Sequence, residues 1–145
     1  MLNETYLFKK VMREITPLTA NDCFSIFSRR KKEFTFPLHT HEEMELNLIL
    51  GGAGTQRIIG DHMGDITDAE LVLVGSNLPH GWFTNGSGDK EILEVTIQFN
   101  RELFSQNFLE KNQLLPIRKL FENAKRGILF SPEVIASVAP HIIAL

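Results

Sequence analysis

The hydrophobic pattern of the chain changes near residue 100, and this change limits the folds open to it. Between Leu93 and Phe99 apolar and polar residues alternate strictly, which predicts a strand with one face buried and the other in water. Beyond Asn100 the apolar residues instead recur every three or four positions, the spacing of an amphipathic helix. The 145 residues are close to the usual size of one domain. We therefore expect one domain that begins with strands and ends with helices.

Short β-rich runs before residue 93 predict a series of strands at residues 24–28, 34–36, 45–50, 55–59 and 71–74. The basic residues 29–32 are interpreted as a solvated turn joining the first two runs into a hairpin, rather than as a phosphate-binding patch. The glycine-rich residues 51–54 are interpreted as the turn of a second hairpin. Short strands at such regular spacing favour a sandwich or a barrel.

Two helices are predicted in the last third of the chain. The first begins near Pro116 and ends before Gly127, and the second begins after the capping residue Ser131. Pro140 is expected to bend or split the second helix because it cannot donate a backbone hydrogen bond. The sequence ends in the apolar residues 142–145, so we expect either a continuation of the chain or a partner over that face.

Composition excludes several classes of protein. Fifteen basic and 18 acidic residues give a net charge of −3, which argues against tight binding to DNA by these residues alone. Neither a membrane-spanning apolar run nor a secretion signal is recognisable, so we expect a cytoplasmic protein without a membrane partner. A single cysteine, Cys23, cannot form an intramolecular disulfide or a multi-cysteine zinc site, and we expect it to be buried.

Three histidines and a glutamate form the densest group of side chains able to bind a metal. His39, His41 and Glu45 share the parity of one strand, and His80 follows the turn at Pro79. On a straight strand the Cα atoms of His41 and Glu45 would lie roughly 13 Å apart, so joint ligation requires a bend between them. Such ligands suit Zn, Fe, Mn, Ni or Cu. Alternatively, neutral imidazoles line a polar end of a barrel without a metal, and Glu45 then pairs with another polar group.

The stretch from Pro37 to Trp82 resembles the paired motifs of the cupin superfamily, with the spacing His39-x-His41-x-x-x-Glu45 followed by Gly52 and, later, His80. More specifically, the chain from His39 to its end resembles the N-terminal cupin domain of AraC-type bacterial transcriptional regulators. Residues 71–82 and 114–131 carry that closer resemblance. The chain departs from the usual second cupin motif at Ala69, Gly75, Asn77 and Thr84.

This resemblance implies a mainly β fold: a cupin-type double-stranded β-helix, or jelly-roll barrel, followed by two or three C-terminal α-helices. It places the barrel in residues 1–100. Residues 101–145 would form a helical segment for packing and dimerisation, leading to a helix-turn-helix DNA-binding domain that is absent from this chain.

The resemblance also implies a function. The domain would sense a small effector, for which the family suggests a sugar, form a homodimer and control DNA binding through the absent domain, without being an enzyme. The expected ligand-binding residues are His39, His41, Glu45, His80 and Trp82, and the first four are also the expected ligands of a divalent transition metal (Zn, Fe, Mn or Ni). Trp82 is interpreted equally well as an aromatic platform for the ligand or as part of the core.

Two other functions are open to the same residues. One is a metal-dependent cupin enzyme, an isomerase or dioxygenase, and the other is a dimerisation module with an empty barrel. Outside the cluster, Arg57 is expected to point outward and pair with an acidic residue, and His62 to face solvent. The sequence leaves open the choice between activator and repressor.

Overall fold

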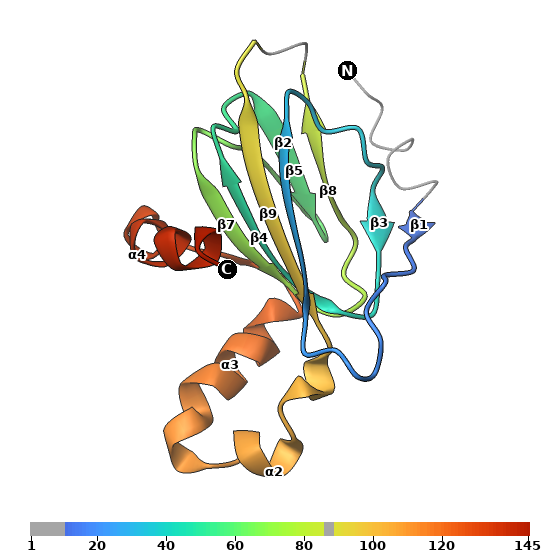
Figure 1. Cartoon of the computed structure of the whole chain (residues 1–145), viewed down its shortest axis with the longest axis vertical. Helices are drawn as coiled ribbons and strands as arrows, with labels where there is room; N and C mark the ends of the chain where they lie inside the picture. The colour runs from blue at the N-terminus through green and yellow to red at the C-terminus, as the bar shows by residue number, and fades with distance from the viewer. Residues whose placement is uncertain (1–10, 86–88) are drawn as a thin grey trace.

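The chain folds as two facing five-stranded sheets with helices against one side, described here from a computed structural model of residues 11–85 and 89–145 (Figure 1). The first sheet has the order β1 (Met12–Arg13), β3 (His39–Thr40), β8 (His80–Thr84), β5 (Thr55–Ile59) and β6 (His62–Asp65). The second has the order β10 (Ile128–Leu129), β7 (Glu70–Val74), β4 (Met44–Leu50), β9 (Ile92–Phe99) and β2 (Ser25–Lys31). The predicted fold class, a mainly β cupin-like barrel followed by helices, is confirmed.

The strands on either side of the glycine-rich turn do not pair with each other. β4 pairs with β7 and β9 in the second sheet, whereas β5 pairs with β6 and β8 in the first. Gly51 and Gly54 have φ values of 73° and 86°, and these positive angles turn the chain from one sheet to the other. The predicted hairpin is wrong because both edges of each strand are paired with other strands: β4 with β7 and β9, and β5 with β8 and with β6, which directly follows it.

The basic run is part of a strand rather than a turn. β2 extends to Lys31 and pairs along its whole length with β9, and residues 34–36 form no strand. Acidic residues in and next to the paired strand β9 explain this: Arg30 pairs with Glu91 at 2.7 Å, and Lys31 pairs with Glu94. Opposite charges across a strand pair favour the extended conformation over a solvated turn, so the predicted first hairpin is wrong.

Strand β9 buries both of its faces. The apolar side, with Val95, packs against Ile135, Ala139 and Ile142 of the last helix. The polar side faces the inside of the barrel, where Gln98 is only 4% exposed. The strand itself is confirmed, but the expected water-facing side instead lines the interior.

Helices follow the barrel as predicted. They are η1 (Arg101–Leu103), α2 (Gln106–Leu109), η2 (Asn112–Leu114), α3 (Leu115–Ala124) and α4 (Pro132–Ile143). Ser131 caps α4 by accepting a hydrogen bond from the Val134 amide, and Gly127 has a φ of 78° just beyond α3. α4 continues through Pro140 as one helix, and the packing of its apolar face on the second sheet stabilises that continuity. Figure 1 shows α4 beside β7, on the side of the barrel away from β1.

Three smaller expectations have mixed outcomes. Cys23 is exposed, not buried, because it lies in the irregular segment before β2. The division into a barrel of residues 1–100 and a helical segment of residues 101–145 stays a prediction. One strand of the second part, β10, joins the second sheet beside β7. Among the described residues no helix is both long and apolar enough to cross a membrane.

Gly75 provides a test of the packing between the barrel and α3. A Cβ atom at this position would lie 2.5 Å from the Ala124 carbonyl oxygen, which already accepts the Gly75 amide at 2.9 Å. Because both contacting groups are backbone, we expect Gly75→Ala to lower the free energy of unfolding by about 1–3 kcal/mol in urea denaturation. The neighbouring Ser76→Ala should change it by less than about 0.5 kcal/mol. Equal stability of the two variants would contradict this packing.

Candidate functional site

Three imidazoles and one carboxylate from both sheets meet inside the barrel. His39 and His80 are directly paired across β3 and β8, and their ring centroids are 4.2 Å apart. His41 lies in the short segment between β3 and β4, where the chain passes from one sheet to the other. This is the bend that joint ligation requires, and it brings His41 Nε2 to 2.9 Å from the Oε2 atom of Glu45.

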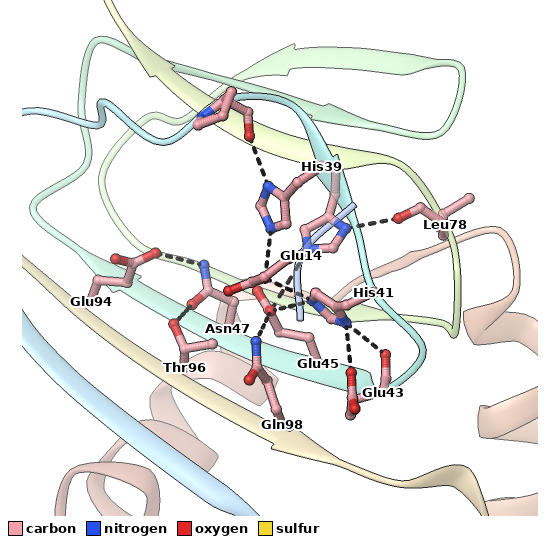
Figure 2. A network of polar contacts seen from close by, with 12 residues as sticks. Glu14, His39, His41, Glu43, Glu45, Asn47, Leu78, Glu94, Thr96 and Gln98 are labelled. Atoms are coloured by element: carbon pink, nitrogen blue, oxygen red, sulfur yellow. Dashed lines mark hydrogen bonds and ion pairs between the residues drawn. The ribbon is translucent and has the colours of Figure 1, made fainter. Parts of the chain in front are cut away.

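Each of the three histidines is oriented by a backbone carbonyl two residues away in sequence. The distances from Nδ1 to the carbonyl oxygen are 2.8 Å for His39 to Pro37, 3.0 Å for His41 to Glu43 and 2.8 Å for His80 to Leu78. A carbonyl accepts only, so each Nδ1 carries a proton and donates it. The Nε2 atoms of His41 and His80 thereby lie 2.9 Å and 3.7 Å from Glu45 Oε2, and Figure 2 shows the rings of His39 and His41 beside the same carboxylate.

The electrostatics of the cluster couple these groups. Burial opposes ionisation of Glu45, but contacts with His41 and His80 outweigh it and hold the pKa of the carboxyl well below its usual value. Burial likewise opposes protonation of His41, but hydrogen bonding to Glu45 outweighs it and raises the imidazole pKa. For His39, burial and the nearby His80 lower the pKa to about 4. Both ring nitrogens of His41 face oxygens that can only accept, the Glu43 carbonyl and the Glu45 carboxylate, so the geometry fits a protonated His41 beside an ionised Glu45.

The donor set fits a divalent transition metal. Ligand atoms of His39, His41, Glu45 and His80 all lie within 4.8 Å of one another, and all four residues are buried. Within residues 11–85 and 89–145, the buried His80 Nε2 has no hydrogen-bond partner, although buried polar atoms are normally paired. Three imidazole Nε2 atoms, once that of His41 has lost its proton, and one carboxylate oxygen are ligands typical of Zn, Fe, Mn or Ni.

A cavity of about 270 Å³ opens directly beside this cluster. His39 and Glu45 form part of its wall, whereas His41 and His80 do not line it. Aromatic and apolar side chains form one part of the lining and charged or polar side chains the other: Glu14, Pro17, Phe27, Arg29, Lys31, Phe34, Phe36, His39, Glu45, Trp82, Glu94, Thr96 and Gln98. The mixed lining is suited to an organic molecule with an apolar body and a polar end.

Trp82 belongs both to the cavity and to the core. Its ring lines the cavity, is 5% exposed and packs with Phe34, while its Nε1 donates to Glu70 at 3.0 Å. Glu70 also pairs with Arg57.

Arg57 is buried, so the expectation that it points outward is wrong, although the expected acidic partner is present. Glu70 draws it inward because a buried carboxylate needs a cation or donors. His62 is exposed, as expected.

Several further polar residues of the site are revealed only by the structure. Gln98 donates to Glu45 at 3.2 Å, and Asn47 donates to Glu94 at 3.3 Å (Figure 2). The alternating pattern of residues 93–99 contains this information, since Glu94 and Gln98 share one parity. Glu14, whose carboxyl pKa is raised by burial, also reaches the cluster, and nothing in its sequence surroundings marks it.

Comparison with solved structures finds ToxT from Vibrio cholerae. ToxT of strain O395 bound to (E)-4-(8-methylnaphthalen-1-yl)but-3-enoic acid aligns with a TM-score of 0.53 and 15% sequence identity, over 85% of this chain and 48% of that chain. Unsaturated fatty acid-bound wild-type ToxT of strain SCE256 aligns with a TM-score of 0.57 and 16% identity, over 86% and 47%. The chain shares its fold with part of ToxT.

ToxT is an AraC-family regulator, so the resemblance to AraC-type effector-binding domains is confirmed as a likeness of fold. This chain spans about half the length of the ToxT chains it matches. Neither the protein-family models nor the curated proteins provide a match.

The lowered pKa of His39 predicts a pH dependence of stability for the metal-free protein. The unfolded chain protonates this imidazole below about pH 6.5, whereas the folded chain does so only near its pKa of about 4. Stability should therefore fall as pH decreases from about 6.5 to about 4, by up to about 3 kcal/mol from this residue. His41, with its raised pKa, should contribute the opposite slope above about pH 6.5.

Urea denaturation in the presence of a chelator, at several pH values, measures this dependence. His39→Phe should lose most of the slope between about pH 6.5 and pH 4, and the exposed-site control His62→Gln should keep it. Parallel profiles for wild type and His39→Phe would show that His39 does not titrate as described.

Proposed function

We propose that this chain is the effector-sensing domain of an AraC-type transcriptional regulator that binds a small organic molecule in the barrel. The observation that carries the proposal is the cavity of about 270 Å³ beside the histidine cluster, inside a barrel that shares its fold with ToxT. In concave ligand sites, aromatic and apolar side chains commonly contact the body of the ligand while polar groups fix its orientation. Two ToxT structures that share this fold hold an organic acid, a naphthyl-substituted butenoic acid in one and an unsaturated fatty acid in the other.

The proposal includes a divalent metal held by His39, His41, Glu45 and His80. A metal would satisfy the His80 Nε2 atom, replace the proton on His41 and leave its charge at the inner end of the cavity. When bound, it would supply a Lewis-acidic position for an oxygen atom of the effector. Trp82 would form the aromatic wall beside it.

The charges of the lining favour an effector that is an organic acid. Lys31 and Arg29 contribute two cations, and Glu14, Glu45 and Glu94 contribute three carboxylates. A divalent metal reverses the balance and leaves one net positive charge. Among the described residues, Lys31 pairs with Glu94, whereas no carboxylate lies within ion-pair distance of Arg29. Arg29 is therefore the group best suited to receive an anionic end. The sugar expected from the family resemblance stays a prediction.

Dimerisation and the control of DNA binding belong to the same proposal. Apolar side chains of the C-terminal part are exposed: Ile117, Leu129, Val134, Ile143 and Leu145. These residues lie on or beside α3 and α4, and the proposed interface would bury them. In this proposal, an effector favours one arrangement of these helices and so changes how a dimer presents a helix-turn-helix domain.

A metal-dependent cupin enzyme, an isomerase or dioxygenase, is the second candidate. The four convergent ligands beside an accessible cavity favour it. The two candidates differ in outcome, because a sensor releases its ligand unchanged, whereas an enzyme converts it.

Metal binding is tested by adding Zn²⁺ to chelator-treated protein and following thermal unfolding. We expect a clear rise in melting temperature for wild type, because only the folded chain assembles the ligands. His80→Ala should lose most of this rise, and the exposed-site control His62→Ala should keep it. Folded wild-type protein whose melting temperature is unchanged by Zn²⁺, Mn²⁺, Fe²⁺ and Ni²⁺ would contradict the metal.

Effector binding is tested by thermal shift with a panel of small aliphatic and aromatic acids and, in parallel, sugars. We expect at least one acid to stabilise the metal-loaded protein and to be recovered unchanged. Arg29→Gln should weaken its binding about ten-fold or more, because a charge-assisted hydrogen bond is lost. Arg30→Gln is the matched control, since Arg30 pairs with Glu91 and does not line the cavity. If only sugars stabilise the protein, the proposal of an organic-acid effector is wrong. If the ligand is converted, the result favours a cupin enzyme over a sensor.

A further inference from the structure

Glu14 places a second carboxylate against the histidine cluster from a segment that the cupin motifs do not include. Its Oε2 atom lies 3.7 Å from His39 Nε2 and 4.0 Å from His41 Nε2 (Figure 2). The side chain is 27% exposed and lines the same cavity as Glu45. Glu14 thus borders both the cluster and the cavity, and its carboxylate approaches the Nε2 atoms of His39 and His41.

We propose that Glu14 is a fifth ligand of the metal and that metal binding thereby fastens strand β1 onto the barrel. The inference rests on the proposed metal site and goes beyond it, because the ligand comes from the N-terminal strand rather than from either motif. A divalent metal with three neutral imidazoles and two carboxylates would have a net charge of zero, which suits a buried position.

The position of Glu14 relative to the imidazole nitrogens distinguishes a ligand from a nearby charge. Glu43 also has a carboxylate oxygen 3.7 Å from a nitrogen of His41, but that nitrogen is Nδ1, which already donates to the Glu43 carbonyl. Glu14 instead approaches Nε2 atoms, whose lone pairs become available to a metal. Two carboxylates at similar distances therefore lie on opposite sides of the His41 ring, and only one can reach the ion.

Strand β1 has few other contacts to hold it. It forms a two-residue parallel pair with β3, Met12 with His39 and Arg13 with Thr40. Arg13 adds hydrogen bonds to Asn77 at 2.6 Å and to Glu42 at 3.0 Å, and its side chain is half exposed. Exposed pairs of this kind contribute little, so a ligand bond from the next residue would strengthen the attachment substantially. Metal occupancy and the position of β1 would then be coupled, and each would favour the other.

The test compares Glu14→Gln with Glu43→Gln in the full 145-residue chain. Zn²⁺ affinity is measured by competition with a chromophoric chelator, and hydrogen exchange of peptides covering residues 11–16 is measured with and without Zn²⁺. Both variants remove one negative charge near His41 and keep the side-chain shape, and circular dichroism confirms their folding.

We expect Glu14→Gln to weaken Zn²⁺ binding about ten-fold or more and Glu43→Gln to change it less than about three-fold. Zn²⁺ should slow exchange of residues 11–16 in wild type and in Glu43→Gln but not in Glu14→Gln. If both substitutions weaken Zn²⁺ binding equally, Glu14 acts only through its charge and is not a ligand, and the proposal is overturned. Unchanged affinity and exchange in Glu14→Gln would overturn it while leaving the metal site and the sensor intact. A wild type that binds no Zn²⁺ would overturn this inference together with the metal, but not effector binding.

Discussion

The organisation of the site depends on three short hydrogen bonds from imidazole Nδ1 atoms to backbone carbonyls. Each carbonyl lies two residues from its histidine, so the local backbone alone sets the ring orientation and the proton position. The strands then need only bring the three rings together, which the direct pairing of His39 with His80 and the turn at His41 achieve. The Nε2 atoms consequently converge on Glu45, and Gln98 and Glu14 reach the same space.

Many polar side chains are buried inside this barrel, and they are arranged in separate networks. One contains the histidines, Glu45 and Gln98, and another joins Glu70 to Arg57 and Trp82. Buried ionic groups contribute little net stability, whereas the apolar outer side of the second sheet packs against α3 and α4. The helices therefore supply much of the apolar core, which leaves the inside of the barrel free to hold a ligand.

The sequence predicted what local patterns determine and missed what depends on strand partners. The strand at residues 93–99, the caps at Ser131 and Gly127 and the cluster of His39, His41, Glu45 and His80 follow from periodicity, turn chemistry and motif spacing. The two hairpins were wrong because nothing local shows that β2 pairs with β9, or that β4 and β5 belong to different sheets. Arg57 and Gln98 were misjudged for a related reason: a polar residue on a strand is expected to face water, but here both side chains lie buried inside the barrel.

Glu14 illustrates the limit most clearly. It lies 25 residues before His39 in a stretch with no motif, and only the parallel pairing of β1 with β3 brings it to the cluster. Such residues are recognisable only once the topology is known. They can couple the position of a distant segment to the occupancy of the site.

The central claim, that three oriented imidazoles and Glu45 form a site for one metal ion beside the cavity, is tested most directly by anomalous diffraction from crystals grown with Zn²⁺. The account predicts a single strong peak within about 2.0–2.2 Å of the Nε2 atoms of His39, His41 and His80 and of a Glu45 oxygen. A barrel with these side chains ordered and no peak between them, or a peak bonded to an Nδ1 atom, would contradict it.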